Sequence, residues 1–246
     1  MSRLDGRSVL VTGGTRGIGL AIARRFAELG AGRVVVGYLR KDSVAEEAAD
    51  ELRAAGTEPV LVRGNVSSGK TVAELASHGP YAAVVHNAAT GVIRSALETE
   101  DRHWDWTMAA NARAFLSLAR ACAPEMEPGS SIVGVSSLGS SRVMENYVLV
   151  GASKAALESV VRYLAVELAP RGIRVNAVSG GLVETGALEH FPNREEMLAA
   201  SRARTPAGRM VEPEDVAGAV AFLCSPDAAM VCGQVLVVDG GFSLPA

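Results

Sequence analysis

A glycine-rich stretch near the N-terminus has the residues and the spacing of a phosphate-binding turn. Residues 12–19 read Thr-Gly-Gly-Thr-Arg-Gly-Ile-Gly, after a β-branched run and at the start of a helical pattern. Gly13 permits a tight turn, Gly17 a close approach of the backbone to a ligand, and Gly19 close packing of helix on strand. A helix N-terminus offers free N–H groups and a positive dipole end to a pyrophosphate. The pattern therefore predicts dinucleotide binding, with a merely structural turn as the alternative.

Two arginines bear on which dinucleotide would bind. A site for NAD usually ends its second strand with an acid that binds the ribose hydroxyls. Here residues 37–41 read Gly-Tyr-Leu-Arg-Lys, and the first acid is Asp42. Arg16 and Arg40 could instead hold a 2′-phosphate by charge-assisted hydrogen bonds. The alternative is that both are solvated surface arginines. We expect NADP(H), with NADPH as the cofactor.

The elements that must position these residues alternate along the chain. Val-rich runs, apolar on both faces, are separated by longer helical patterns, which indicates a parallel sheet covered on both sides. Crossovers between parallel strands are right-handed by default, so we predict a doubly wound, Rossmann-type α/β fold. The predicted strands are residues 8–12, 33–38, 59–62, 82–86, 132–136, 174–179 and 235–238, and the predicted helices are residues 17–29, 43–54, 102–126, 147–168 and 213–223.

One segment departs from this compact pattern. Residues 186–210 are polar and Arg-rich and contain two prolines. Connecting segments that carry function lie on the surface above a scaffold, so we predict an insertion that forms a substrate lid. The chain otherwise has no repeat, low-complexity segment or linker, and residues 1–246 are expected to form a single domain.

The composition excludes several classes of protein. With 48% hydrophobic and 21% charged residues, the chain can bury a large core. A formal net charge of −3 argues against nucleic-acid binding, and no apolar run approaches the ~20 residues that span a membrane. The N-terminus lacks the long apolar stretch of a signal peptide, so we expect a cytoplasmic protein. The 3 cysteines and 4 histidines have no metal-ligand spacing, so we expect no metal.

Further motifs, together with the glycine stretch, resemble the short-chain dehydrogenase/reductase family over nearly the whole chain. That family has a Thr-Gly-x-x-x-Gly-x-Gly pattern, an Asp-Val pair beside the adenine, a strand-end Asn-Asn-Ala-Gly and a Pro-Gly-x-x-x-Thr segment. The last of these carries Ser in place of Pro here. The matching residues are Asn65-Val66, His86-Asn87-Ala88-Ala89, the helix-interior Asn111, Val135-Ser136-Ser137, Ser179-Gly180-Gly181 with Thr185, and Asp239-Gly240-Gly241.

The spacing of a Tyr and a Lys is typical of one branch of that family. The commoner branch has its catalytic Tyr four residues before the Lys, but four residues before Lys154 stands Val150. Tyr147 lies seven residues before Lys154, which is the spacing of the divergent branch with the bacterial enoyl-acyl carrier protein reductases. The chain has only 3 Lys and 4 Tyr, so few other pairs exist. Residues 136–154 resemble enoyl-acyl carrier protein reductase III in particular.

The spacing also has a physical meaning if both residues lie on one helix. Residues four or seven apart stay near one face, and moving the Tyr three positions earlier shifts its Cα by about 4.5 Å along the axis. In ketone reduction, hydride adds to the carbon whose oxygen the Tyr protonates. In conjugate reduction it adds to the β-carbon, so a displaced hydroxyl suits that reaction, although a Tyr side chain can also swing.

The resemblance implies a role for each matching residue. Tyr147 would hydrogen-bond a thioester carbonyl and stabilise the developing enolate. Lys154 would hold the nicotinamide ribose, and Ser137 and Asn111 would complete the catalytic set. The cofactor-binding residues would be Gly13, Thr15, Arg16, Gly17, Ile18, Gly19, Leu39, Arg40, Asn65, Val66, Asn87, Ala88, Ala89, Lys154, Gly181, Val183 and Thr185.

Each of these roles has a structural alternative. Tyr147 could be an ordinary core Tyr, and Lys154 a surface-helix Lys. Asn111 could simply satisfy the backbone of a helix bulge. His86, at the end of a predicted strand, is best interpreted as a core His whose hydrogen bonds are satisfied.

The function implied by the resemblance is NADPH-dependent reduction of the C=C bond of a trans-2-enoyl thioester, in fatty-acid or polyketide biosynthesis. One alternative is a secondary-metabolite tailoring reductase acting on C=C or C=O of a polyketide-type substrate. Another is a non-catalytic NADP(H)-binding protein. The substrate carrier would be acyl carrier protein or CoA, and the family is usually a homotetramer. Four arginines could steer an acidic carrier or form an ordinary charged face: Arg194, Arg202, Arg204 and Arg209.

Overall fold

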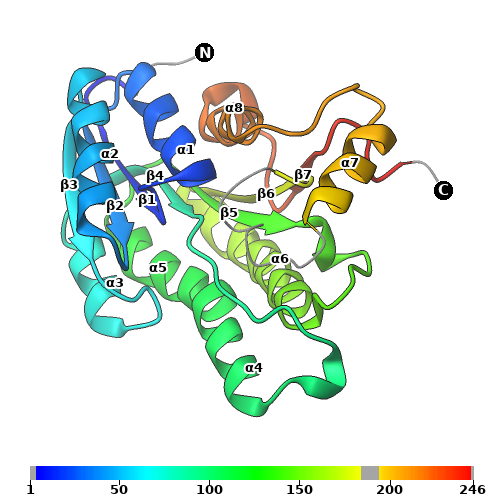
Figure 1. The fold of residues 1–246 in the computed structure, drawn as a ribbon. Helices are drawn as coiled ribbons and strands as arrows, with labels where there is room; N and C mark the ends of the chain where they lie inside the picture. Colours follow the sequence, from blue (N-terminus) through cyan, green and yellow to red (C-terminus); the bar gives the residue numbers. More distant parts are fainter. Residues whose placement is uncertain (1–3, 184–193, 245–246) are drawn as a thin grey trace.

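The computed structural model describes residues 4–183 and 194–244 (Figure 1). Thr185 and residues 186–193 of the predicted lid lie outside the described residues. No helix in the described part of the chain is both long enough and apolar enough to cross a lipid bilayer.

A parallel sheet forms the centre of the molecule. Its strand order is β3-β2-β1-β4-β5-β6-β7, so the winding reverses between β1 and β4. This confirms the doubly wound fold, and each strand ends within one residue of its predicted boundary. The strands are β1 (Ser8–Thr12), β2 (Arg33–Tyr38), β3 (Glu58–Arg63), β4 (Tyr81–His86), β5 (Ser131–Ser137), β6 (Arg174–Gly180) and β7 (Val235–Val238).

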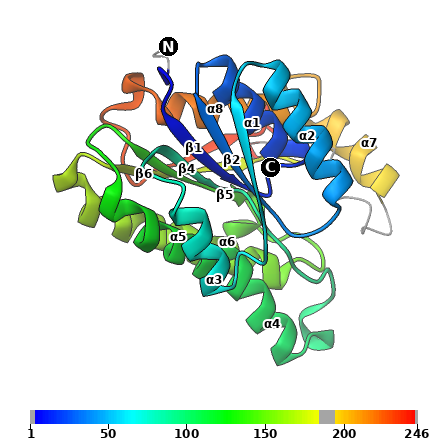
Figure 2. The ribbon, with the colours of Figure 1, turned by 90° about the vertical axis from the view of Figure 1, so that its left-hand side faces the viewer.

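Helices cover both faces of the sheet, as Figure 2 shows. One face carries α1 (Gly17–Glu28), α2 (Asp42–Ala54) and α8 (Pro213–Cys224). The other carries α3 (Gly69–Ala76), α5 (Ala114–Cys122) and α6 (Val148–Leu168), with α4 (Asp101–Met108) leading into α5.

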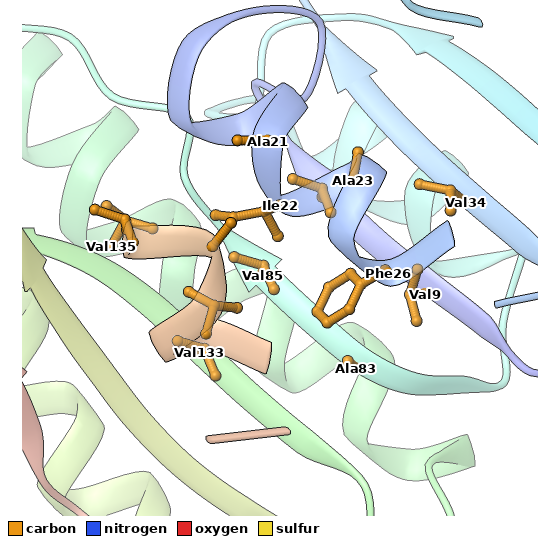
Figure 3. Close-up of a cluster of buried hydrophobic side chains, with 14 of the residues drawn as sticks. Val9, Ala21, Ile22, Ala23, Phe26, Val34, Ala83, Val85, Val133 and Val135 are labelled. Atoms are coloured by element: carbon orange, nitrogen blue, oxygen red, sulfur yellow. The ribbon is translucent and has the colours of Figure 1, made fainter. Parts of the chain in front are cut away.

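Each face of the sheet has its own hydrophobic core because successive strand residues point to opposite sides. In Figure 3, the ring of Phe26 from α1 lies against Val9 and Ala83 of the sheet. On the opposite face, Leu10 and Ile132 belong to a second buried cluster with residues of α5 and α6. The Val-rich strands are therefore buried on both sides, as the sequence predicted.

The helix α7 (Arg194–Arg204) forms part of the segment predicted as a lid. Leu198 of α7 is buried against Met210, and Leu182, just after β6, packs on this pair. This small cluster is separate from the two main cores. The sequence reading did not foresee a helix here.

The helix α6 begins one residue later than predicted. Tyr147 is its N-cap residue, with φ −109° and ψ 10°, and the carbonyl of Tyr147 accepts the first helical hydrogen bond from the Gly151 N–H at 2.8 Å. The preceding Asn146 has φ +57°, a left-handed turn conformation. Tyr147 and Lys154 were expected on one face of a single helix. This is wrong for Tyr147, because it is the N-cap residue and precedes the first residue of α6.

The predicted helix of residues 102–126 is interrupted. Between α4 and α5 lies a π-helical turn, Ala109–Arg113, and a 3₁₀ turn, Ala123–Glu125, follows α5. A π-helical turn is rare and frequently occurs at a functional site. Asn111, one of the predicted catalytic residues, lies in the middle of this turn.

Candidate active site

The predicted site residues gather at the carboxyl ends of the strands. Ligands of open α/β sheets bind outside these ends, where the strand order reverses. Here that point lies between β1 and β4, whose last residues, Thr12 and His86, are paired in register. Thr12 is also in register with Gly37 of β2. The glycine turn therefore begins beside the ends of β2 and β4.

The glycine turn is packed so tightly that side chains are excluded. Gly13 has φ +65° and Gly17 has φ +52°, conformations that favour glycine. A Cβ on Gly19 would overlap the Gly13 carbonyl oxygen and stand 2.6 Å from Asn87 Nδ2. The Asn87 amide donates to the carbonyls of Thr12 at 3.2 Å and Gly13 at 3.1 Å. Asn87 thus fixes the shape of the turn.

The rim of the turn is positively charged. Arg16 is the N-cap residue of α1, in an extended conformation, and its side chain caps no N–H group of the helix. Arg16 and Arg40 are exposed, and neither guanidinium has a hydrogen-bond or ion-pair partner among the described residues. The nearby Asp42 is occupied, since its carboxylate accepts from Tyr38 Oη at 3.0 Å and from Arg63 Nη1 at 2.9 Å. The residues present therefore fit a 2′-phosphorylated dinucleotide.

His86 is a fully buried residue with hydrogen bonds at both ring nitrogens. Its Nε2 lies 3.1 Å from the carbonyls of Ala110 and Asn111, which makes Nε2 the protonated nitrogen. Its Nδ1 then accepts from Thr12 Oγ1 at 3.1 Å. Burial, reinforced by the charge of Lys154, lowers the pKa of His86 to about 3. The interpretation of His86 as a satisfied core histidine is confirmed.

Asn111 connects the loop after β4 to α6. Its Oδ1 accepts from the Thr90 N–H at 2.9 Å, and its Nδ2 donates to the Thr90 carbonyl at 2.9 Å and to Ser153 Oγ at 2.8 Å. Both amide hydrogens are therefore used within the protein. The geometry matches the structural alternative, an Asn beside a helix bulge, and it fixes α6 next to the π-helical turn.

Lys154 is buried rather than on the surface. Its side chain is 4% exposed, and Nζ donates to the Val135 carbonyl at 2.7 Å. Burial lowers the pKa of Lys154 to about 8, and the nearby carboxylate of Glu158 acts in the opposite direction. Glu158 itself accepts from Ser136 Oγ at 2.5 Å. The alternative of a surface-helix lysine is excluded by this burial.

Tyr147 and Ser137 face each other at the end of β5. The Tyr147 hydroxyl donates to Ser137 Oγ at 3.4 Å, and the same oxygen accepts from the Gly139 N–H at 3.3 Å. Ser137 is the N-cap residue of the 3₁₀ turn Leu138–Ser140. Burial raises the pKa of Tyr147, with the hydrogen bond to Ser137 acting against it. Tyr147 is therefore a protonated hydrogen-bond donor at neutral pH.

Position 150, where the commoner branch of the resembled family has its Tyr, is filled by an apolar contact. Val150 is 7% exposed. A Cβ added to Gly91, in the loop after β4, would overlap Val150 Cγ2. The side chain at 150 thus packs tightly on this loop, and it offers no polar group.

The remaining predicted cofactor residues line the same edge. Thr15 is buried, Ile18 and Val66 are half-buried, and Leu39, Asn65 and Ala89 are exposed. The Ala88 N–H donates to Thr12 Oγ1 at 3.1 Å. Gly181 lies against Asp239, and Val183 forms an isolated bridge to Val211. Thr185 lies outside the described residues.

Several site residues escaped the sequence reading. Glu158 was detectable in principle, because it stands four residues after Lys154 on the same helix. Gly139 and Gly151 were not: a Cβ on Gly139 would lie 2.5 Å from Cδ1 of the Tyr147 ring, and one on Gly151 would lie 2.6 Å from the Gly139 oxygen. These close contacts, which require glycine at both positions, could not be predicted from a residue pattern.

The arginines near the predicted lid are partly occupied. Arg209 forms a two-pronged ion pair with Asp215, with bonds of 2.6 and 2.7 Å. The guanidinium of Arg204 lies over the ring of Phe242, 5.2 Å from its centroid. Nothing is described of the Arg194 side chain. The charge of Arg209 is thus balanced by Asp215.

The fold and the glycine turn at its reversal point are those of a dinucleotide-binding α/β protein. A family model described as enoyl-(acyl carrier protein) reductase matches residues 13–243. The chain belongs to the short-chain dehydrogenase/reductase family, and is therefore related to oxidoreductases along nearly its whole length.

Individual relatives span more than one chemistry. A 1-cyclohexenylcarbonyl-CoA reductase of Streptomyces collinus is 38% identical over 98% of this chain and 89% of its own. A galactitol 2-dehydrogenase (L-tagatose-forming) of Cereibacter sphaeroides is 35% identical over 98% of this chain and 97% of its own. The crystal structure of a short chain dehydrogenase from Burkholderia cenocepacia, in complex with NADP, superposes with a TM-score of 0.90 at 32% identity, covering 98% of this chain and 99% of that one.

Proposed function

We propose that the protein is an NADPH-dependent reductase of the C=C bond of a trans-2-enoyl thioester. The observation that carries the proposal is the pair of Tyr147 and Ser137, 3.4 Å apart, combined with an apolar, packed Val150. Tyr147 therefore supplies the hydroxyl beside Ser137, and its displacement from position 150 supports conjugate reduction. The description of the matching family model and the CoA-thioester relative support the same reading.

NADPH fits the residues at the reversal point of the sheet. The glycine turn and the first N–H groups of α1 would hold the pyrophosphate. Arg16 and Arg40 would hold the 2′-phosphate, because both are exposed and unpaired among the described residues. When bound, the cofactor supplies a hydride for the β-carbon of the substrate.

Tyr147 would act on the substrate oxygen. Its hydroxyl stays protonated because burial raises its pKa, so it can donate a hydrogen bond to the thioester carbonyl. That bond strengthens as negative charge develops on the oxygen of the enolate. A proton taken up from water at the α-carbon would then complete the reduction. When the Tyr147 hydrogen is donated to the substrate, Ser137 would hold the Tyr147 oxygen by donating its own hydroxyl hydrogen across the same 3.4 Å contact.

Lys154 would supply positive charge behind this bond. The ammonium is held by the Val135 carbonyl at 2.7 Å, at the end of the same strand that carries Ser137. A cation in a buried site stabilises a nearby anion more strongly than it would in water. Asn111 acts as a positioning residue, because its amide fixes the Thr90 loop to α6.

The substrate would be carried by acyl carrier protein or CoA beneath a lid that includes residues 186–210. An acidic carrier would be steered by basic residues on the rim. Reversing the charges of Arg202 and Arg204 together should raise the KM for a carrier-linked substrate more than that for crotonyl-CoA. An equal rise for both substrates would count against carrier docking.

The test of the proposed activity is NADPH oxidation, followed by absorbance, with crotonyl-CoA and then with a panel of ketones. Turnover of the enoyl thioester is expected, and Tyr147→Phe should lower kcat by about 10²–10³-fold, the typical effect of losing one donor to a developing oxyanion. Reduction of ketones alone would overturn the proposal.

A second candidate function is oxidation or reduction at an alcohol or ketone carbon, as in a tailoring reductase. The galactitol dehydrogenase relative favours it, since its identity to this chain is nearly that of the CoA reductase. The ketone panel separates the two. Tight binding of NADPH with no turnover of any thioester or ketone would leave the third reading, a protein that binds NADP(H) without catalysis.

A further inference from the structure

The ring of Tyr147 lies where two other residues leave room for it. A Cβ on Gly139 would stand 2.5 Å from Cδ1 and 2.6 Å from Cε1 of the ring, distances that real Cβ atoms do not adopt. The same Cβ would lie 3.4 Å from the Met144 sulfur. Any side chain at 139 would therefore displace the Tyr147 ring or the turn that carries Gly139.

Gly151 supports this arrangement from the first turn of α6. A Cβ on Gly151 would lie 2.6 Å from the Gly139 carbonyl oxygen and 3.9 Å from Cδ1 of Tyr147. Its main contact is thus with the backbone of the 3₁₀ turn Leu138–Ser140. A side chain here would push that turn away from α6, and the Tyr147 ring would lose its support.

The backbone itself does not demand glycine at either place. Neither Gly139 nor Gly151 has φ in the positive range, whereas Gly13 and Gly17 do. An L-residue could adopt the backbone conformation of both. Space for the Tyr147 ring and for close approach of the turn is what remains to explain the two glycines.

The hydroxyl end of the ring depends on this fit. Tyr147 Oη reaches Ser137 Oγ at 3.4 Å, and Ser137 Oγ also accepts from the Gly139 N–H. The turn that admits the ring is therefore hydrogen-bonded to the residue that receives the hydroxyl. Three positions after Tyr147, the side chain of Val150 is packed against Gly91.

We propose that Gly139 and Gly151 are specificity-determining positioning residues that form a seat for the Tyr147 ring, so that residue 147 rather than residue 150 supplies the reacting hydroxyl. This inference rests on the proposed function, because it concerns the reduction assigned to the same site. It adds that the seven-residue spacing of Tyr147 and Lys154 places the Tyr147 hydroxyl beside Ser137 only when residues 139 and 151 are glycines.

The first experiment compares Gly139→Ala with Gly218→Ala, using crotonyl-CoA and NADPH. Gly218, in α8, also lacks a positive φ, and a Cβ there would meet nothing within 4 Å, so this variant serves as the matched control. Gly139→Ala should lower kcat by about 100-fold, as a misplacement of about 1 Å can, with the Kd for NADPH unchanged. Gly151→Ala should lower kcat by about tenfold, since it acts through the turn.

A double mutant makes the comparison specific to the ring. In a Tyr147→Phe background, Gly139→Ala should cause little further loss of kcat, because the hydroxyl is already absent. Full loss in both backgrounds, or no loss in Gly139→Ala alone, would overturn the proposal. If Gly139→Ala folds poorly, thermal melts decide: in a Tyr147→Ala background, where the ring is absent, Gly139→Ala should lower the Tm little further, and an equally large drop in both backgrounds would overturn the proposal.

A readout without turnover separates this inference from the proposed activity. In protein labelled with 3-fluorotyrosine, the Tyr147 resonance is assigned with Tyr147→Phe. Gly139→Ala should shift this resonance and leave those of Tyr38, Tyr81 and Tyr163 in place. If the wild-type protein reduces no enoyl thioester, the proposed function fails, while the fluorine spectrum still decides whether Gly139 positions the ring. An unmoved Tyr147 signal would overturn the seat.

Discussion

The glycine turn after β1 and the seat of Tyr147 after β5 use the same residue for different reasons. In the turn, Gly13 and Gly17 have positive φ values, so the backbone conformation itself favours glycine. In the seat, Gly139 and Gly151 have ordinary backbone conformations and lack a side chain because the Tyr147 ring and the adjoining turn occupy the space. The first region would hold the proposed cofactor, and the second holds a side chain of the chain itself.

The two regions also differ in their charge environment. The glycine turn is bordered by the exposed Arg16 and Arg40, whose charges remain in water and would attract the anion of the proposed cofactor. The seat lies near Lys154, which is 4% exposed and whose pKa burial lowers to about 8. Positive charge serves binding in one region and acts inside a low-dielectric site in the other.

Lys154→Met should cause the largest loss of activity, about 10²–10³-fold in kcat, by analogy with removal of a group that stabilises transition-state charge. In the wild-type protein, activity that needs the ammonium should fall as the pH rises through about 8. A pH profile of kcat/KM across the neutral and alkaline range measures this limb. A limb near the ordinary value of 10.5 would show that burial does not perturb Lys154.

Lys154 should also affect stability: where activity falls with rising pH, the free energy of unfolding should increase. In the unfolded chain it stays protonated up to pH 10.5, but in the folded chain only to about 8. Between these values the unfolded state binds more protons, so the free energy of unfolding should rise with pH. Lys154→Met should lack this rise in denaturant titrations, whereas an unchanged pH dependence would contradict the prediction.

His86 lies between the two regions and should dominate acid destabilisation by a single histidine. Its pKa is 6.5 ordinarily and about 3 in the folded protein, so the stability gained from the neutral ring is present above 6.5 and is lost as the pH falls towards 3. The expected loss by pH 4 is about 3 kcal/mol. Denaturant midpoints of wild-type protein and His86→Asn, compared across this range, should differ in slope. Parallel slopes would refute the assignment.

Gly19→Ala should distort the backbone of the glycine turn. The added methyl group would overlap the Gly13 carbonyl oxygen, and such overpacking typically destabilises by about 1–3 kcal/mol. Because the clash lies within the turn, NADPH affinity should fall together with stability. Equilibrium unfolding and NADPH titration measure the two, with Gly218→Ala as the control. A stable variant with normal NADPH affinity would show that the turn can relax.

Arg40→Asp should change cofactor choice with the smallest effect on the fold, because the residue is exposed. The loss of one charge-assisted hydrogen bond predicts about a tenfold or larger rise in KM for NADPH. The KM for NADH should change far less. Steady-state kinetics with both cofactors give the ratio, and equal effects on the two would remove Arg40 from the 2′-phosphate site.

The sequence predicted the fold well because its signals are local and repeated. Val-rich runs on both faces and a glycine stretch at the first crossover indicated the strands, their direction and the reversal point. Residues 102–126 were predicted as one continuous helix, and a bulge at Asn111 was only an alternative, because the π-helical turn involves bonds of Asn111 with Thr90 and Ser153, residues distant in the chain. The roles of the individual site residues remain predictions that the experiments above address.

The geometry of the site was harder to predict than the fold, because it depends on contacts between residues that are distant in the chain. The importance of Tyr147 and Lys154 could be inferred from their spacing, but their geometry could not, since Tyr147 precedes α6 instead of lying on it. The burial of Lys154 against a strand carbonyl depends on tertiary packing. Gly139 carries no local signal, because its need for glycine arises from a ring eight residues away that folds back onto it.

The π-helical turn determines how α4 is rotated about the helix axis relative to α5, and without it the two would form one helix. It holds one residue more between hydrogen-bond partners than an α-helical turn does. Each residue of an α-helix advances roughly 100° round the axis, so deleting Ala112 would let α4 and α5 fuse while rotating α4 by that amount. Trp104 and Trp106, about half-exposed on α4, would then point in another direction. A relative that lacks one residue at this point of an alignment should therefore present a different face of α4 to solvent.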